Sequence, residues 1–307
     1  MSRDAGVELL VFDVGGSHIA CGVLSLKTGT LSQVRRTPTP VTGPSEEFFR
    51  AVEVLGKQLL TAPEALAGLA LAVPNPFDYE RGISYMEHKY QYLYGVDLRR
   101  ALADRFACDP SRIHFLNDAA AFLIGEIHQG AAVGIGRSIG ITLGTGVGSA
   151  FAVNGRIVTD DPNVPPGGEI WNLSYREGIV EDVISGRSIR EIYKRLTGSM
   201  AEVREIARRA AEDAIARQAF EIFGQELGKV LRATCAAFHP ERIVFGGAIS
   251  HSGDLFLPAA RAELASDTIE LCVSQLFDNA PLIGAGISWQ QQQGVDRHDS
   301  LASPTAR

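Results

Sequence analysis

The segment 141–149 reads Ile-Thr-Leu-Gly-Thr-Gly-Val-Gly-Ser, and it has an echo near the N-terminus. Its apolar start predicts a β-strand. Its three alternating glycines predict a turn whose backbone can come close to a ligand and aim N–H groups at a phosphate. The echo, at 9–23, reads Leu-Leu-Val-Phe-Asp-Val-Gly-Gly-Ser-His-Ile-Ala-Cys-Gly-Val, again strand, glycine turn and strand, with an added aspartate. Two such hairpins predict a phosphate tail held from both sides.

The composition is that of an ordinary globular protein. The 307 residues are 45% hydrophobic and 21% charged, which allows two domains and a large core. A net charge of -7 argues against a general nucleic-acid surface. No apolar run reaches transmembrane length, and residues 1–6 are too few and too polar for a signal peptide. We therefore expect a cytoplasmic protein with no membrane partner.

Secondary-structure patterns repeat along the chain. The first part predicts strands at 8–14, 18–25, 30–37, 66–73 and 113–116, with helices at 45–61 and 97–106. The second part predicts strands at 138–143, 149–153, 156–158, 242–245 and 269–273, helical sequence from 178 to 238, and a closing helix at 280–292. Two α/β halves of similar layout predict a duplicated fold with a cleft between the halves.

Two aspartates follow predicted buried strands. Asp13 precedes the turn Gly15, Gly16 and Ser17, and it is either a plain turn residue or a holder of hydrated Mg²⁺. Asn117 and Asp118 end a strand where a helix begins, so both are candidate N-caps. In a ligand crevice, however, Asp118 can accept a proton from an attacking hydroxyl, and the helix N-terminus would hold it ionised.

Three further pieces complete the set. Glu169, in Pro-Pro-Gly-Gly-Glu-Ile, and Glu181 could accept hydrogen bonds from sugar hydroxyls, although Glu181 is equally a solvated helix residue. At 243–250 an apolar strand meets Gly246 and Gly247, which suits packing against a flat adenine, or is only a strand with a turn.

In this order, the motifs Asp-Val-Gly-Gly-Ser, Asn-Asp-Ala-Ala-Ala, Leu-Gly-Thr-Gly-Val-Gly, Gly-Gly-Glu-Ile and Phe-Gly-Gly-Ala-Ile-Ser resemble the ROK family of bacterial sugar kinases, in the actin/hexokinase/sugar-kinase superfamily. The resemblance covers about residues 9–287. It implies two ribonuclease-H-like (actin-like ATPase) domains closing over a hexose and ATP: a sugar-side domain at 1–117 and a nucleotide-side domain at 118–292. The last helix is expected to pack back on the first domain, and 293–307 to be a disordered tail.

The resemblance also implies roles for individual residues. Asp118 resembles the base that deprotonates the sugar's 6-hydroxyl, and Asp13 a Mg²⁺ site reached through water. The sugar-binding set is Asn117, Asp118, Glu169, Asn172 and Glu181. The ATP-binding set is Gly15, Gly16, Ser17, Gly144, Thr145, Gly146, Gly246 and Gly247. Family resemblance further implies a homodimer.

The chain departs from the family pattern in one segment. Most members continue Gly-Glu-x-Gly-His into a cysteine-rich zinc loop, whereas Asn172 stands here in place of the histidine and the zinc loop is absent. We expect no structural zinc. Because the histidine contacts the sugar in the family, the usual glucose or N-acetylhexosamine preference is open. An asparagine hydrogen bond has different reach and polarity.

The stretch between Pro76 and Gly95 is rich in aromatic and basic side chains. Its tyrosines either stack on a sugar or, as we favour for most of them, pack against a neighbouring domain or subunit. His88 or Lys89 could meet an anionic substrate or a polyphosphate donor, and some zinc-free relatives use polyphosphate. The stretch contains Tyr79, Tyr85, Tyr90, Tyr92 and Tyr94.

The leading hypothesis is an ATP-dependent hexose 6-kinase of the glucokinase type. The alternatives are a polyphosphate-dependent glucokinase, a non-catalytic sugar-sensing pseudokinase or regulator, and a superfamily kinase acting on another polyol or acid. Family repressors carry an N-terminal helix-turn-helix, and only residues 1–7 precede the first strand here. We therefore expect no direct DNA binding.

Overall fold

A computed structural model describes residues 8–40, 42–87 and 90–294, which divide into two compact α/β units. The first unit runs to Leu116 and resumes at Ala285, and the second comprises Asn117–Gly284. The division at Leu116 lies one residue before the predicted boundary, and the later one falls inside the last helix. Of the predicted disordered tail, residues 295–307 lie outside the described part.

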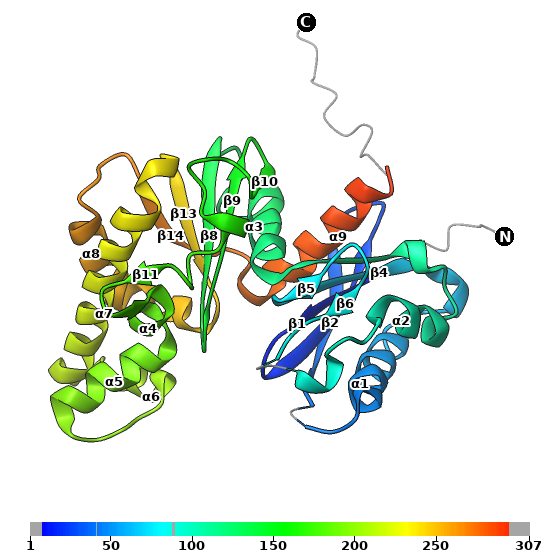
Figure 1. The fold of residues 1–307 in the computed structure, drawn as a ribbon, viewed down its shortest axis with the longest axis horizontal. Coiled ribbons are helices and arrows are strands. Elements are labelled where there is room, and N and C mark those ends of the chain that lie inside the picture. Colours follow the sequence, from blue (N-terminus) through cyan, green and yellow to red (C-terminus); the bar gives the residue numbers. More distant parts are fainter. Residues whose placement is uncertain (1–7, 41, 88–89, 295–307) are drawn as a thin grey trace, which may run out of the picture. The chain divides into compact units, whose positions relative to one another are not determined.

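The first unit is built on a five-stranded sheet of order β3-β2-β1-β4-β7 (Figure 1). β1 pairs antiparallel with β2 and parallel with β4, and β2 pairs antiparallel with β3. Leu9 to Phe12 are all 0% exposed, so β1 is covered on both faces. The strands are β1 (Glu8–Val14), β2 (His18–Ser25), β3 (Leu31–Pro38), β4 (Leu66–Val73) and β7 (Ile113–Asn117).

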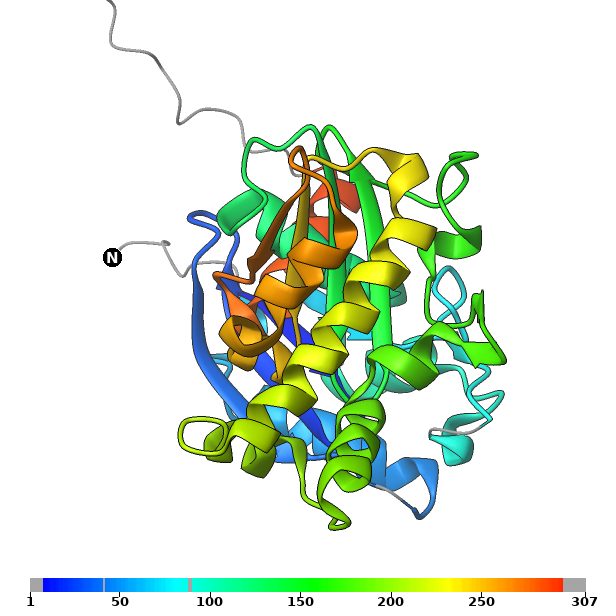
Figure 2. The ribbon, with the colours of Figure 1, turned by 90° about the vertical axis from the view of Figure 1, so that its left-hand side faces the viewer.

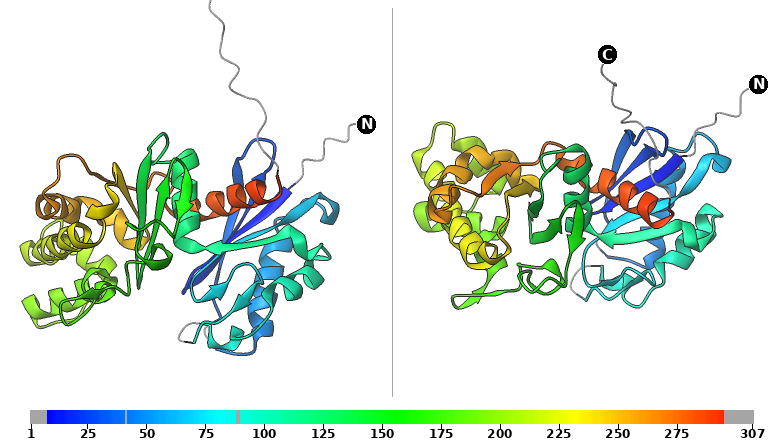
Figure 3. Two further views of the ribbon diagram at one scale, coloured as in Figure 1. Left: turned by 45° about the horizontal axis from the view of Figure 1, so that its top comes forward. Right: turned by 90° about the horizontal axis from the view of Figure 1, so that it is seen from above.

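Different helices cover the two faces of this sheet. Phe48 of α1 (Ser45–Lys57) joins the core that contains Leu10 and Phe12, together with residues of α2 (Leu98–Phe106). On the other face lies α9 (Ala280–Gln292), as Figure 3 shows. Its Gly286 leaves room for the side chains of Val11 and Leu24.

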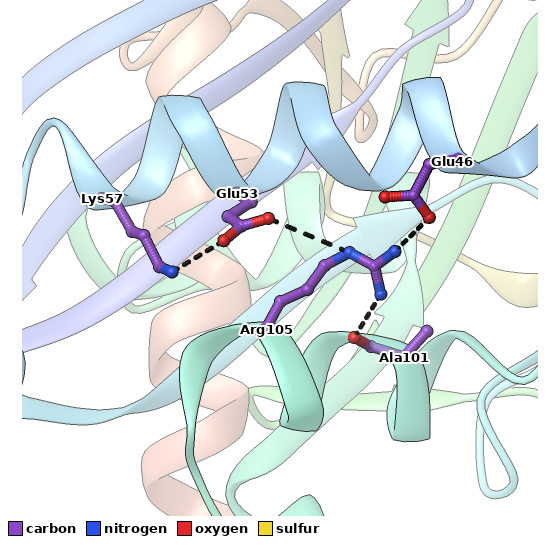
Figure 4. A network of polar contacts seen from close by, with 5 residues as sticks. All are labelled: Glu46, Glu53, Lys57, Ala101 and Arg105. Atoms are coloured by element: carbon purple, nitrogen blue, oxygen red, sulfur yellow. Dashed lines mark hydrogen bonds and ion pairs between the residues drawn. The ribbon is translucent and has the colours of Figure 1, made fainter.

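A polar network ties α1 to α2 at the surface (Figure 4). Arg105 of α2 pairs with Glu46 and, at 4.0 Å, with Glu53, and its Nη1 donates to the carbonyl of Ala101 at 2.9 Å. Lys57 joins Glu53 at 2.7 Å. The guanidinium also lies over the Phe49 ring, so it contributes packing as well as charge.

The second unit repeats the sheet plan in the order β10-β9-β8-β13-β14. β8 pairs antiparallel with β9 and parallel with β13, and β9 pairs antiparallel with β10, as in the first unit. This confirms the predicted duplicated α/β fold. The strands are β8 (Arg137–Leu143), β9 (Val147–Val153), β10 (Arg156–Val158), β13 (Arg242–Gly246) and β14 (Glu270–Val273).

The alternation along β8 separates two helical layers. Ile139 and Ile141 join the core formed with the helices between residues 180 and 264, while Gly140 faces Leu123 of α3 (Asp118–Gln129). In the layer that packs on Ile139 and Ile141, Gly228 of α7 (Ala214–Thr234) lets the backbone of α8 (Gly253–Leu264) approach closely. Figure 2 shows these two helices side by side. The layer comprises α4 (Val180–Ile184), α5 (Gly186–Thr197), α6 (Val203–Arg209), α7 (Ala214–Thr234) and α8 (Gly253–Leu264).

Some predicted bounds are wrong. Helix α1 ends at Lys57 and not near Thr61, whose N–H and hydroxyl both donate to the Glu8 carboxylate, at 3.2 and 3.0 Å. Two-residue strands also went unpredicted because they carry no periodicity: β5 (Phe77–Asp78), β6 (Ile83–Ser84), β11 (Ser174–Tyr175) and β12 (Gly178–Ile179). The short 3₁₀ helices are η1 (Pro63–Ala65), η2 (Gln91–Leu93), η3 (Pro110–Arg112), η4 (Pro166–Gly168), η5 (Ala236–Phe238), η6 (Ala248–Ser252) and η7 (Phe277–Asn279).

Within the described ranges, no helix has both the length and the apolar character needed to cross a membrane.

Candidate active site

The glycine loop of the second unit joins β8 to β9 and is fastened at its base. The N–H of Gly144 donates to the carbonyl of Gly146 at 3.0 Å, and the Gly144 carbonyl accepts from the N–H of Gly186 at 2.8 Å. A Cβ on Gly186 would lie 3.0 Å from that carbonyl, so a glycine at the start of α5 allows this approach. Thr145 is exposed at the tip. A loop that is held by hydrogen bonds at Gly144 and exposed at Thr145 suits phosphate binding.

Glu181 contacts this loop directly. Its Oε2 accepts from the N–H of Val147 at 3.0 Å, and the residue is half-buried near the start of α4. The reading of Glu181 as a solvated helix residue is therefore wrong. A carboxylate predicted to bind sugar hydroxyls also holds the backbone of the predicted phosphate loop.

Asn117 and Asp118 lie where β7 ends and α3 begins. Asn117 is the N-cap, since its Oδ1 accepts from the N–H of Ala120 at 3.0 Å. Asp118 is the first helical residue, and its Oδ1 accepts from the N–H of Ala119 at 2.9 Å. A Cβ on Gly148 would lie 3.1 Å from the Ala119 side chain, so the first turn of α3 packs against the strand leaving the glycine loop. Asp118 thus sits at a helix N-terminus beside that loop.

The segment carrying Glu169 is anchored to β9 through Ser149. The hydroxyl of buried Ser149 donates to the Gly168 carbonyl at 2.6 Å and accepts from the N–H of Ile170 at 3.0 Å. The indole N–H of Trp171 donates to Glu169 Oε2 at 2.9 Å. Sequence reasoning missed Ser149, although a serine within an otherwise apolar strand was a usable signal.

The same segment leads to Asn172 and back to Glu181. Asn172 is exposed, and the carbonyl of its neighbour Trp171 accepts from the N–H of Glu181 at 3.0 Å. Glu169, Asn172 and Glu181 therefore belong to one connected stretch of the second unit.

Gly246 and Gly247 end β13 against the base of the glycine loop. Gly246 pairs in register with Thr142 of β8. Gly247 has φ +78°, and a Cβ there would lie 2.4 Å from the carbonyl oxygen of Leu143, the residue before Gly144. Glycine is thus required at 247 for both conformation and space, and the predicted adenosine and phosphate motifs are neighbours.

The glycine turn of the first unit is also fastened from a distance. Asp13 is half-buried in β1 opposite Ala20, while Gly16 and Ser17 are exposed. The carbonyl of Gly15 accepts from the hydroxyls of Thr39 at 2.7 Å and Tyr90 at 2.5 Å. In a trans peptide the next N–H points the opposite way. The two hydroxyls therefore aim the Gly16 N–H away from themselves.

The tyrosine-rich stretch packs mainly within the first unit. The hydroxyls of Tyr79 and Tyr92 donate to the carbonyls of Val73 at 3.0 Å and Pro40 at 2.6 Å. Burial, with a contribution from nearby Glu47, raises the pKa of Tyr92 to about 12. Tyr85 and Tyr94 are exposed at 39% and 51%. His88 and Lys89 lie outside the described residues.

The second unit brings most of the predicted site together at one end of its sheet. This end holds the N-terminus of α3, the glycine loop with Glu181, and the Gly246–Gly247 turn. The Asp13–Ser17 turn belongs to the first unit, and it is described by itself. Within the described ranges, no group of three or more His, Cys, Asp or Glu side chains is placed to hold a metal ion.

Two α/β units whose sheets share one strand order, each with a glycine turn between its first two strands, define the actin-like ATPase fold class. Within that class, the chain belongs to the ROK family, which matches residues 9–292. This confirms the resemblance seen in the motifs.

Three relatives illustrate the match. The glucokinase of Thermotoga maritima is 26% identical over 313 residues, covering 91% of this chain and 96% of that protein. The N-acetyl-D-glucosamine kinase of Salmonella typhimurium is 25% identical over 261 residues, covering 78% of this chain and 84% of that protein. The crystal structure of a ROK family glucokinase from Streptomyces griseus, in complex with glucose and AMPPNP, has a TM-score of 0.77 at 21% identity, covering 92% of this chain and 99% of that one.

Proposed function

We propose that this chain is a sugar kinase that transfers the γ-phosphoryl group of ATP to the 6-hydroxyl of a hexose, glucose or a close relative. Family membership supports the class, as do relatives matched over most of their length that are glucokinases and N-acetyl-D-glucosamine kinases. The observation that carries the proposal is the position of Asp118 at the N-terminus of α3, packed beside the glycine loop within one unit.

The chemistry asked of Asp118 is proton transfer. As the sugar 6-oxygen forms its bond to the γ-phosphorus, the bond from that phosphorus to the β–γ bridging oxygen breaks and ADP leaves. The hydroxyl proton passes to the Asp118 carboxylate. The N–H groups at the start of α3 favour the carboxylate in its charged form, which is the form a base needs. Positioning and charge neutralisation supply the rest of the rate.

We assign the ATP phosphates to the two glycine turns, at Gly15, Gly16 and Ser17 and at Gly144, Thr145 and Gly146. We assign the adenosine to Gly246 and Gly247. Mg²⁺ binds few protein carboxylates and keeps waters and phosphate oxygens. A single half-buried Asp13 beside an exposed glycine turn fits that preference. When bound, the ion neutralises phosphate charge.

We assign the sugar hydroxyls to Asn117, Glu169, Asn172 and Glu181. Because Glu181 Oε2 holds the Val147 N–H, we assign its Oε1 to the sugar. Asn172 is exposed and offers both a donor and an acceptor. We further propose that the protein acts in the cytoplasm as a homodimer.

The direct test replaces Asp118 by asparagine. Asp118→Asn removes the proton acceptor but keeps the shape, so we expect kcat to fall at least ~10²-fold, the size usual for a lost general base, while sugar binding survives. Both are measured with a coupled ADP assay and calorimetric titration of the sugar. Asp267→Asn, an exposed residue of the same unit, is the matched control. Near-normal turnover in Asp118→Asn would sink the assignment.

A further inference from the structure

Phe277 has an unusual backbone conformation. It opens η7 with φ +48°, in the left-handed region, where a bulky non-glycine residue is rarely found. Such residues persist where the surrounding structure holds them, and they gather at functional sites. A function of the Phe277 side chain should therefore be apparent from its contacts.

The Phe277 ring lies flat on the imidazole of His251. Their centroids are 4.5 Å apart and their planes differ by 9°. The turn below is tightly held, since the N–H of Phe277 donates to the Ser274 hydroxyl at 2.6 Å and the N–H of Ser274 donates to the Phe245 carbonyl at 2.8 Å. This fixes the turn to the end of β13, one residue before Gly246.

His251 follows the Gly246–Gly247 turn in the chain, whereas the Phe277 turn is hydrogen-bonded to Phe245, which precedes it. His251 belongs to η6, which begins directly after Gly247. The N–H and hydroxyl of Ser250 donate to the Gly247 carbonyl at 3.1 and 2.8 Å. His251 is exposed, so its ring offers surface to another planar group while one face rests on Phe277.

We infer that the His251–Phe277 stack is the platform for the purine base of the donor nucleotide. The inference rests on the proposed function, in which ATP is the donor. Aromatic side chains bind nucleobases by stacking, because every base presents a π face. Gly247 adjoins the backbone of Leu143, one residue before the glycine loop. The platform and the phosphate loop therefore lie at the same end of the second sheet, as the two ends of a nucleotide require.

The test compares ligands with and without a base. The free energy of stacking an aromatic side chain on one base corresponds to about a 5- to 150-fold change in affinity. We expect His251→Ala to raise the KM for ATP and the Kd for ADP by about that factor, with kcat changed by less than about twofold. The Kd for tripolyphosphate, which has no base, should stay the same. His251→Phe keeps a flat ring and should retain ADP affinity.

Phe277→Gly separates stacking from folding. The substitution removes the ring but also relieves the left-handed conformation, so ADP affinity should fall while the melting temperature stays equal or rises. Ala265→Gly is the matched control, because Ala265 is another left-handed residue of the second unit, with φ +52° at the end of α8, away from the stack. It should leave ADP affinity unchanged.

Each result decides the matter. Unchanged ADP affinity in His251→Ala, equal weakening of ADP and tripolyphosphate, or a wild-type protein that binds no ADP would overturn the platform. Suppose that the wild-type protein phosphorylates no hexose, but that His251→Ala binds ADP more weakly than the wild type does. The role of the platform is then supported, and the sugar-kinase proposal fails. The two proposals thus fail separately.

Discussion

Glu126 is a fully buried carboxylate that the proposed chemistry does not use. It is 0% exposed in α3, and both of its oxygens accept hydrogen bonds. Two donors are the N–H groups of Ala131 at 2.7 Å and Leu276 at 3.1 Å, and two more are the Ser274 hydroxyl and the Gln275 N–H. A buried charge is tolerated only with such partners. Glu126 therefore fastens the end of α3 to the turn that precedes α9.

Replacing Glu126 by glutamine should destabilise the second unit. An amide keeps the shape but turns an NH₂ group toward groups that are themselves donors, which costs about 2–3 kcal/mol. We expect that loss in urea unfolding followed by Trp171 fluorescence in a Trp289→Phe background, so that the signal comes from the second unit. The control is Glu221→Gln, at an exposed position of α7. An equal loss in both variants would contradict the role given to Glu126.

Individual site residues could be predicted only where a motif carries them. Asn117 and Asp118 were readable because a strand meets a helix there, and the N-cap bond of Asn117 is confirmed. The hydrogen bond from the Tyr90 hydroxyl to the Gly15 carbonyl could not be predicted from the sequence, since 75 positions separate the two residues. The same is true of Glu181 and Val147, 34 positions apart. Such contacts depend on how the elements pack, and no local pattern records that.

At the level of elements, prediction worked best for apolar segments with clear breakers. β1, β2, β4 and α9 have the predicted bounds, because glycine, proline or polar residues end each apolar pattern. The end of α1 was wrong because Leu59 and Leu60 continue the apolar pattern past the helix, while Thr61 binds Glu8 instead. Tertiary hydrogen bonds thus decided where local pattern did not.

The contact between β7 and α9 should make the first unit sensitive to acid. His114 Nε2 lies 2.8 Å from the Ser288 hydroxyl. Burial, and then the nearby positive charge of Arg99, lower the pKa of His114 from 6.5 to about 4. The folded state therefore keeps His114 neutral at pH values where the unfolded chain protonates it. The stability that depends on this is complete above about pH 6.5 and is lost as the pH falls toward 4.

Because the pKa of His114 is about 4 in the folded state and 6.5 in the unfolded chain, the unfolding free energy of the first unit should fall by about 3 kcal/mol from pH 7 to 4. It is measured by urea unfolding at a series of pH values with Trp289 as the reporter. His114→Gln should flatten the profile in this window, whereas His239→Asn, at an exposed histidine of the other unit, should not. The same acid loss in His114→Gln would contradict the account.

Across the whole molecule, the two units have the same strand order, and each carries a turn predicted to bind phosphate. In the first unit the turn follows an aspartate, and hydroxyls of Thr39 and Tyr90 hold its carbonyl. In the second the loop is richer in glycine, and Glu181 and the start of α5 hold it. Each phosphate-type turn is thus positioned by a side chain from a distant segment. The duplication was predictable from the two hairpins, whereas these supports were not.

Phosphoryl transfer by the purified chain tests the sugar-kinase proposal. A panel of hexoses, including glucose, N-acetylglucosamine and mannose, is incubated with Mg²⁺ and either ATP or polyphosphate, and the products are read by phosphorus NMR. We predict that ATP with at least one hexose gives ADP and the hexose 6-phosphate. Sugar binding without turnover with either donor would contradict the sugar-kinase proposal and favour a sensor. Turnover with polyphosphate alone would refute ATP as the donor.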